Sequence, residues 1–167
     1  AVVEWFLHWT MQRAVATQSA LPYLAGFPRQ RLTAEMLRDQ VLATSGLMSD
    51  GLYGPGVFLY QPPGLWEEIG LAESEWSVQK FTRSSGADLY RRSLYTFWKR
   101  TSPAPNMIAF DAPERQVCTT HRETTNTPLQ ALVLWNDPSY VEAARELAAK
   151  AMRAESSDKL RMAFIYQ

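Results

Sequence analysis

The stretch Thr127-Pro-Leu-Gln-Ala-Leu-Val-Leu-Trp-Asn-Asp-Pro138 carries two helix-start signals in succession. Thr127 can accept a hydrogen bond from a free N–H at the start of a helix, Pro128 stands where its missing N–H costs nothing, and Gln130 can complete a capping box. The Asp-Pro pair at the end of the stretch repeats this arrangement. The sequence therefore predicts two consecutive helices, the second of which runs to about Arg153.

Further helices are predicted on both sides of this stretch. Thr33 can cap a helix that ends at about Ser45, because Gly46 can adopt the left-handed conformation that terminates a helix. Residues 2–17 contain no Pro or Gly and place large apolar side chains at helical intervals, which predicts a helix buried over much of its circumference. The serine pair at 156–157 can begin a last helix.

The clearest amphipathic pattern of the chain lies in residues 87–100. Ser85 can start a helix there, and at about 100° per residue the aromatic side chains and Leu94 gather on one side and the basic ones on the other. We therefore predict a helix that is aromatic inside and basic outside. Pro103 prevents its continuation.

Long connections rich in Pro and Gly separate the predicted helices. Residues 48–64 form one such connection, and long loops in compact domains are often functional. The region from Arg100 to Thr125 is expected to be mostly irregular, and residues 76–81 favour a short extended segment. The sequence therefore predicts a mainly α fold, with one compact helical domain over residues 1–167 and at most a short β pair.

The composition excludes several classes of protein. Seventeen basic and seventeen acidic residues give a formal net charge of zero, so nothing indicates a nucleic-acid binder. The longest apolar runs, 131–135 and 162–166, have five residues, whereas a membrane-spanning helix needs about 20. Cys118 is the single cysteine, which excludes an internal disulfide and a thiolate-rich metal cluster.

The zero net charge hides a segregation along the chain. Residues 51–79 contain four acidic side chains and no basic one, whereas residues 80–100 contain six basic side chains and one acidic one. One interpretation is that both blocks are solvated faces or mutual partners. The other is that an anionic ligand or partner docks on the basic block.

Few residues have the pattern of a catalytic or metal site. Asp111 is the most isolated acid and the one candidate for acid–base catalysis. Cys118 and His121 stand three apart and could present two ligands to a metal ion, but a closed zinc site needs four and His8 is the only other histidine. We therefore predict no metal site in the chain.

Arg122 and Asn126 directly precede the capped helix start at Thr127. A helix N-terminus offers free N–H groups and a positive dipole end, so together with Arg122 it could bind a carboxylate, sulfate or phosphate. Alternatively, these residues only cap the helix and tie down the loop. Aromatic side chains such as Trp98 and Tyr60 could stack on sugar rings or simply fill the core.

Seven motifs, in order between about residues 24 and 148, resemble the DUF1553 family. They include Tyr60-Gln-Pro-Pro-Gly-Leu-Trp-Glu67, Asp88-Leu-Tyr-Arg-Arg-Ser-Leu-Tyr-Thr-Phe-Trp-Lys-Arg-Thr101 and Thr125-Asn-Thr-Pro-Leu-Gln-Ala-Leu132, with shorter matches at 31–39, 45–48, 54–57 and 110–113. Where family members more often have arginine, this chain has His121, which further weakens a metal site.

The resemblance implies a setting and no reaction. It identifies the chain as a fragment, the C-terminal module of a planctomycete-type multidomain protein with an export signal, an upstream cytochrome c-like domain and a second uncharacterised domain. The implied location is extracytoplasmic, in the periplasm or at the cell surface. No cofactor is expected in this chain, because any haem would belong to the upstream domain, and the implied partners are the upstream domains of the same polypeptide.

Three functions remain open from the sequence. The leading one is an accessory or interaction module that meets an anionic or carbohydrate ligand through residues in the family's motifs: Arg91, Arg92, Trp98, Arg122 and Asn126. The second is a hydrolase-type enzyme that acts on polysaccharide, with Asp111, Arg122 and Asn126 in one pocket. The third is a structural scaffold segment whose motifs serve folding alone.

Overall fold

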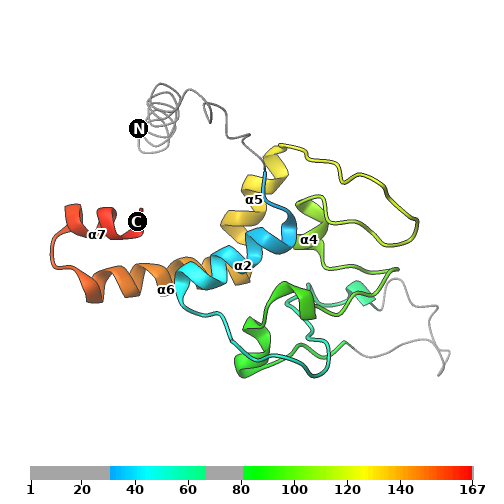
Figure 1. Cartoon of the computed structure of the whole chain (residues 1–167), viewed down its shortest axis with the longest axis horizontal. Helices are drawn as coiled ribbons and strands as arrows, with labels where there is room; N and C mark the ends of the chain where they lie inside the picture. Colours follow the sequence, from blue (N-terminus) through cyan, green and yellow to red (C-terminus); the bar gives the residue numbers. More distant parts are fainter. Residues whose placement is uncertain (1–30, 67–80, 167) are drawn as a thin grey trace, which may run out of the picture. The chain divides into compact units, whose positions relative to one another are not determined.

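The structure is a computed structural model that describes residues 31–66 and 81–166. Its elements follow in the order α2 (Ala34–Ser45), the 3₁₀ helices η1 (Gly86–Tyr90) and η2 (Ser93–Tyr95), α4 (Pro105–Ala109), α5 (Pro128–Asn136), α6 (Pro138–Ala154) and α7 (Asp158–Ile165) (Figure 1). In these two ranges, β pairing is limited to the isolated parallel bridges Ser49–Arg91 and Val57–Thr96. The predicted mainly α fold is confirmed. The helix predicted over residues 2–17 and most of the extended segment 76–81 lie outside the described residues.

Helix α2 begins and ends where its caps predict. Thr33 Oγ1 accepts a hydrogen bond from Met36 N at 3.3 Å, which satisfies one of the free N–H groups of the first turn. Gly46 follows the helix with φ of 82°, a conformation that costs a residue without a side chain little. Local capping chemistry therefore fixes both ends of this helix.

The two consecutive helices predicted from Thr127 onward are also present. Thr127 N donates to Gln130 Oε1 at 3.5 Å, and Pro128 is the first residue of α5. Asp137 Oδ1 accepts from Ser139 N at 2.9 Å at the start of α6, which ends at Ala154, one residue beyond the prediction. Helix α7 follows its predicted serine cap.

The core lies where α2, α4 and α6 meet the long loop of residues 48–64. Its buried members are mostly small or aliphatic: Ala34, Val57, Leu59, Ala104, Met107, Phe110, Ala112 and Tyr140. Phe110 meets Tyr140 edge to face, with ring centroids 6.1 Å apart. Helix α4 begins at Pro105 and supplies the fully buried Met107. It lies in the region that was expected to be mostly irregular. The loop therefore contributes two of the eight buried core residues, Val57 and Leu59.

The amphipathic helix predicted over residues 87–100 is wrong. This segment forms η1 and η2 joined by extended residues, and Leu94, expected on the buried side, is 82% exposed. Its backbone pairs with the long loop: Val57 N donates to Tyr95 O at 2.8 Å, and Phe97 N donates to Val57 O at 2.8 Å. In an α-helix, the Tyr95 carbonyl and the Phe97 N–H would form hydrogen bonds within the segment. Here both pair with the backbone of Val57, so the segment does not form an α-helix.

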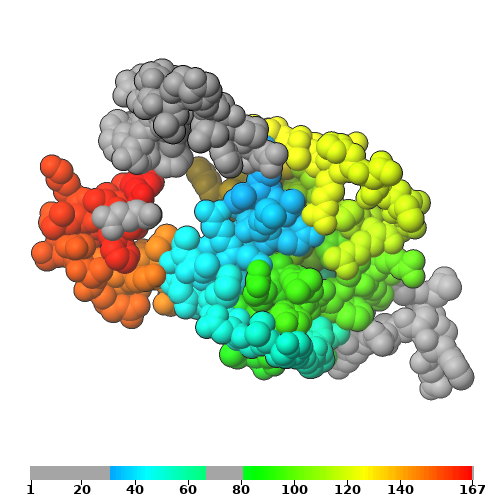
Figure 2. Space-filling view, in the orientation of Figure 1, coloured from blue at the N-terminus to red at the C-terminus, as the bar shows by residue number. Residues whose placement is uncertain are grey.

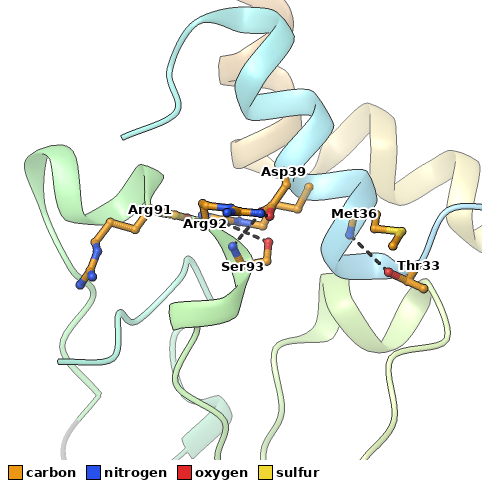
Figure 3. A network of polar contacts seen from close by, with 7 residues as sticks. Thr33, Met36, Asp39, Arg91, Arg92 and Ser93 are labelled. Atoms are coloured by element: carbon orange, nitrogen blue, oxygen red, sulfur yellow. Dashed lines mark hydrogen bonds and ion pairs between the residues drawn. The ribbon is translucent and has the colours of Figure 1, made fainter. Parts of the chain in front are cut away.

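Arg38 of α2 holds the same segment from the other side. Its side chain is buried, and the guanidinium donates to Arg91 O and Leu89 O, each at 2.8 Å, and to Ser93 Oγ at 3.2 Å. The neighbouring Asp39 accepts from Ser93 N at 2.7 Å and faces Arg92 and Ser93 in Figure 3. Burial lowers the pKa of Arg38, and the negative charge of Asp39 opposes that shift. One turn of α2 thus fixes both 3₁₀ helices.

We predict that Arg38→Ala lowers the free energy of unfolding by about 2–3 kcal/mol, because it leaves one buried and one partly buried carbonyl group without their charged donor. Urea denaturation measures the loss. Arg145→Ala, on the exposed face of α6, is the matched control and should change stability by less than about 0.5 kcal/mol. Equal effects of the two substitutions would contradict the role assigned to Arg38.

Candidate functional site

Arg91 faces the interior of the domain. Its guanidinium donates to Pro55 O at 2.9 Å and to Tyr53 O, and it lies 4.0 Å from the centroid of the Tyr95 ring. Tyr53 and Gly54 both have positive φ, so this turn of the loop has an unusual backbone that the arginine holds in place. The Arg91 side chain therefore supports the loop by two hydrogen bonds, while its guanidinium packs on Tyr95 of η2.

Arg92 and Arg122 are more exposed, and each has an acidic partner on α2. Arg92 Nε lies 3.7 Å from Asp39 Oδ2. Arg122 forms a two-point pair with Glu35, with nitrogen–oxygen distances of 2.8 and 3.2 Å. Figure 2 shows the loop around Arg122, in yellow, against the start of α2, in blue. These arginines tie two loops to one helix.

The Glu35 carboxyl has a pKa below its ordinary value. Burial by itself raises this pKa, but the hydrogen bonds from Arg122 and from the backbone, together with the positive charge of Arg122, lower it further than burial raises it. The carboxylate therefore stays ionised and paired at neutral pH.

Asp111 serves as a hydrogen-bond acceptor within the loop. Its carboxylate accepts from Thr125 N at 2.7 Å and from Thr125 Oγ1 at 2.8 Å, and Gln130 Nε2 donates to the same Thr125 hydroxyl at 3.1 Å. Asp111 itself has φ of 60°. The acid thus closes the loop of residues 112–124 onto the start of α5.

The predicted site residues do not gather in one place. Asp111 and Arg122 line a cavity of about 280 Å³ together with His121, but Asn126, the third member of the predicted catalytic set, is not among its lining residues. Trp98 does not line this cavity either, although its Nε1 donates at 3.2 Å to the backbone oxygen of Glu114, which does. The prediction of these residues as a ligand or catalytic site stays a prediction.

Cys118 is exposed in the loop that also holds His121. Within the two described ranges, no three His, Cys, Asp or Glu side chains are grouped so that they could hold a metal ion. A search of the same residues finds no helix with the length and apolar character needed to span a bilayer.

A larger cavity, which we call the Asn106 groove, was not predicted from the sequence. It has a volume of about 410 Å³ and lies between the loop end at Tyr60 and helices α4, α5 and α6. Its lining residues are Tyr60, Pro62, Pro105, Asn106, Leu132, Val133, Asn136, Asp137 and Pro138. Asn106 is 5% exposed and its Oδ1 has no hydrogen-bond partner. The groove combines apolar walls with an unsatisfied amide, a combination typical of small-molecule sites.

A second cavity adjoins the Asn106 groove. It has a volume of about 340 Å³ and shares Tyr60 and Pro62 with it. Six buried side-chain polar atoms of the described residues lack a hydrogen-bond partner. Three of them belong to residues that line these two cavities, namely Gln61, Trp66 and Asn106. Unsatisfied polar groups are therefore concentrated there.

Helix α5 leaves its large apolar side chains in solvent. Gln130 is its one buried residue, whereas Leu129 is 58% exposed and Trp135 is 79% exposed. Leu132 and Leu134 are exposed as well. The helix carries no charged residue. We call Leu129, Leu132 and Trp135, which recur at three-residue intervals along one side of the helix, the α5 apolar surface.

The fold and its polar contacts define a mainly helical domain whose loops are anchored by arginine side chains. The chain belongs to the PSD1 family, a family of proteins of unknown function (DUF1553). The family model matches residues 9–167. This match confirms the resemblance seen in the seven motifs. No similar curated protein and no similar solved structure was found.

We predict that Arg122→Ala removes a pH-dependent part of the stability. Because the folded-state pKa of Glu35 is depressed, the pair stabilises the fold above the unfolded-state pKa of about 4.3, and this contribution is lost as the pH falls through the folded-state value. The pair is partly exposed, so the difference at pH 7 should be about 0.5–1 kcal/mol.

Thermal unfolding of the wild type and of Arg122→Ala between pH 2 and pH 7 tests this. The two stabilities should converge at the acid end. The control Arg100→Ala removes an exposed arginine with no acidic partner among the described residues and should not change the pH profile. A constant gap between the wild type and Arg122→Ala at every pH would contradict the pairing.

Proposed function

We propose that this domain is a non-catalytic interaction module of an extracytoplasmic, cytochrome-linked polypeptide, and that it docks on another domain of that polypeptide through the α5 apolar surface. The exposure of this surface is the observation that carries the proposal. Large apolar side chains that cluster on the surface of a domain mark interaction sites, and aromatic residues such as Trp135 are enriched there.

The choice of a domain in the same polypeptide follows from the setting that the family resemblance implies. A covalently linked partner is present at a high effective concentration, so a modest apolar surface is sufficient for docking. The absence of charge on α5 favours an apolar counterpart, because a charged partner surface would lose hydration there without gaining an ion pair.

The non-catalytic part of the proposal is supported by the contacts of Asp111. A general acid or base must exchange a proton with a substrate, whereas the Asp111 carboxylate already accepts two hydrogen bonds from Thr125. Arg122 is likewise paired with Glu35. These contacts suit residues that hold a loop in place.

An anionic ligand at the arginines is the weaker form of the interaction hypothesis. It would compete with Asp39 for Arg92 and with Glu35 for Arg122, and it would have to displace Arg91 from the loop carbonyl groups. The α5 apolar surface faces no such competition within the described residues.

We predict that Leu129→Glu releases the docked domain without unfolding it, because the side chain is already exposed. Hydrogen–deuterium exchange of the intact polypeptide should show faster exchange across Pro128–Asn136 in the variant, by about tenfold if docking contributes about 1.4 kcal/mol. Leu94→Glu is the matched control, an exposed leucine away from α5. Equal exchange in both variants and the wild type would contradict docking through α5.

A further inference from the structure

We propose that the Asn106 groove binds a neutral carbohydrate, and that the Asn106 amide accepts a hydrogen bond from a sugar hydroxyl. This inference is independent of docking through the α5 apolar surface. The two proposals share one residue, Leu132, and otherwise rest on different residues.

The Asn106 side chain is buried without a partner for its oxygen. It is almost fully buried at the second position of α4, and its Oδ1 has no hydrogen-bond partner. Buried polar groups are nearly always satisfied, because an unpaired one loses the hydrogen bonds that water would provide. Asn106 lines the groove, so a ligand in the groove lies next to the side chain that lacks a donor.

The lining of the groove carries no positive charge and offers mainly hydrogen-bond acceptors. No Lys, Arg or His lines the groove, and Asp137 is its one charged residue. Asp137 Oδ1 already accepts from Ser139 N, and Asn136 Nδ2 already donates to Leu132 O. The groove therefore offers acceptors rather than positive charge, which disfavours an anion and favours a ligand that carries several hydroxyl donors.

Part of the groove wall is apolar. Tyr60 and three prolines line the groove, together with Leu132 and Val133 of α5. A sugar ring presents C–H groups on its faces and hydroxyls at its edge, so it can pack on such a wall and direct hydroxyls toward Asn106. A purely apolar ligand would leave the amide unsatisfied.

The neighbouring cavity extends the site toward a second sugar ring. It continues past Tyr60 and Pro62 to the aromatic side chains of Trp66 and Phe81. Its own unsatisfied groups are Gln61 Oε1, an acceptor, and Trp66 Nε1, a donor. Trp66 itself is 3% exposed, and Lys99 Nζ lies over its ring at 4.1 Å from the centroid, so a second sugar ring would pack on Tyr60 and the exposed Pro62 and Pro63 instead.

Titration of the full ¹⁵N-labelled chain tests the proposal. The probes are glucose, N-acetylglucosamine and cellobiose, with sodium sulfate and tetramethylammonium chloride as charged comparisons, each added to 50 mM. At least one sugar should shift the amide resonances of groove residues in a saturable manner, with cellobiose bound more tightly than glucose. No saturable shift with any sugar, or preferential binding of sulfate or tetramethylammonium in the groove, would overturn it.

Substitutions locate the binding. Asn106→Ala should weaken sugar binding at least tenfold and leave the melting temperature unchanged or raised, because it removes an unsatisfied amide. Ser102→Ala is the matched control: its hydroxyl is also buried without a partner, but Ser102 does not line the groove. If Asn106→Ala does not fold, Tyr60→Leu provides the same test through loss of stacking.

The result separates this inference from docking through α5. Leu129→Glu should leave sugar binding unchanged, because Leu129 does not line the groove. Wild-type sugar affinity in both Asn106→Ala and Tyr60→Leu would overturn the carbohydrate site, whatever the outcome for α5.

Discussion

The described part of the domain depends on one buried cation. Arg38 reaches from α2 to two carbonyl groups and one hydroxyl of the segment Leu89–Ser93, and these contacts hold that segment in 3₁₀ and extended conformations. The next residue, Asp39, holds Ser93 N from the same turn. With this segment in place, Arg91 can turn toward the long loop and hold its carbonyl groups. Val57 and Leu59 of this loop then pack in the core.

This chain of contacts explains which parts of the fold could be predicted from the sequence. The ends of α2 and the starts of α5 and α6 depend on residues within one turn of the helix end, such as Thr33, Gly46 and Asp137, so local patterns predict them. The conformation of residues 87–100 depends on Arg38 and on the loop, which lie far away in the chain. Its amphipathic pattern arises from aromatic residues that also suit extended structure, so periodicity alone predicted a helix.

The candidate sites also combine features that the sequence predicts with features that depend on contacts between distant parts of the chain. The motif arginines were recognised as important, but their partners, Asp39 and Glu35 among them, become visible only once α2 is placed against the loops. Asn106 carries no sequence signal at all, because an asparagine after proline is ordinary at a helix start. Its significance comes from burial without a partner beside a cavity formed by three separate segments of the chain. The motif arginines therefore hold loops in place, whereas the Asn106 groove and the α5 apolar surface are the features for which we propose binding roles.

The backbone conformation of residues 86–100 is the most direct test of this account. Measurement of ¹³Cα chemical shifts in the full chain, for the wild type and for Arg38→Met, would report it residue by residue. We expect non-helical shifts for Arg91, Arg92 and Thr96 in the wild type, and a change of these shifts when Arg38 is replaced. A continuous run of helical shifts from Ala87 to Arg100 in the wild type would contradict it.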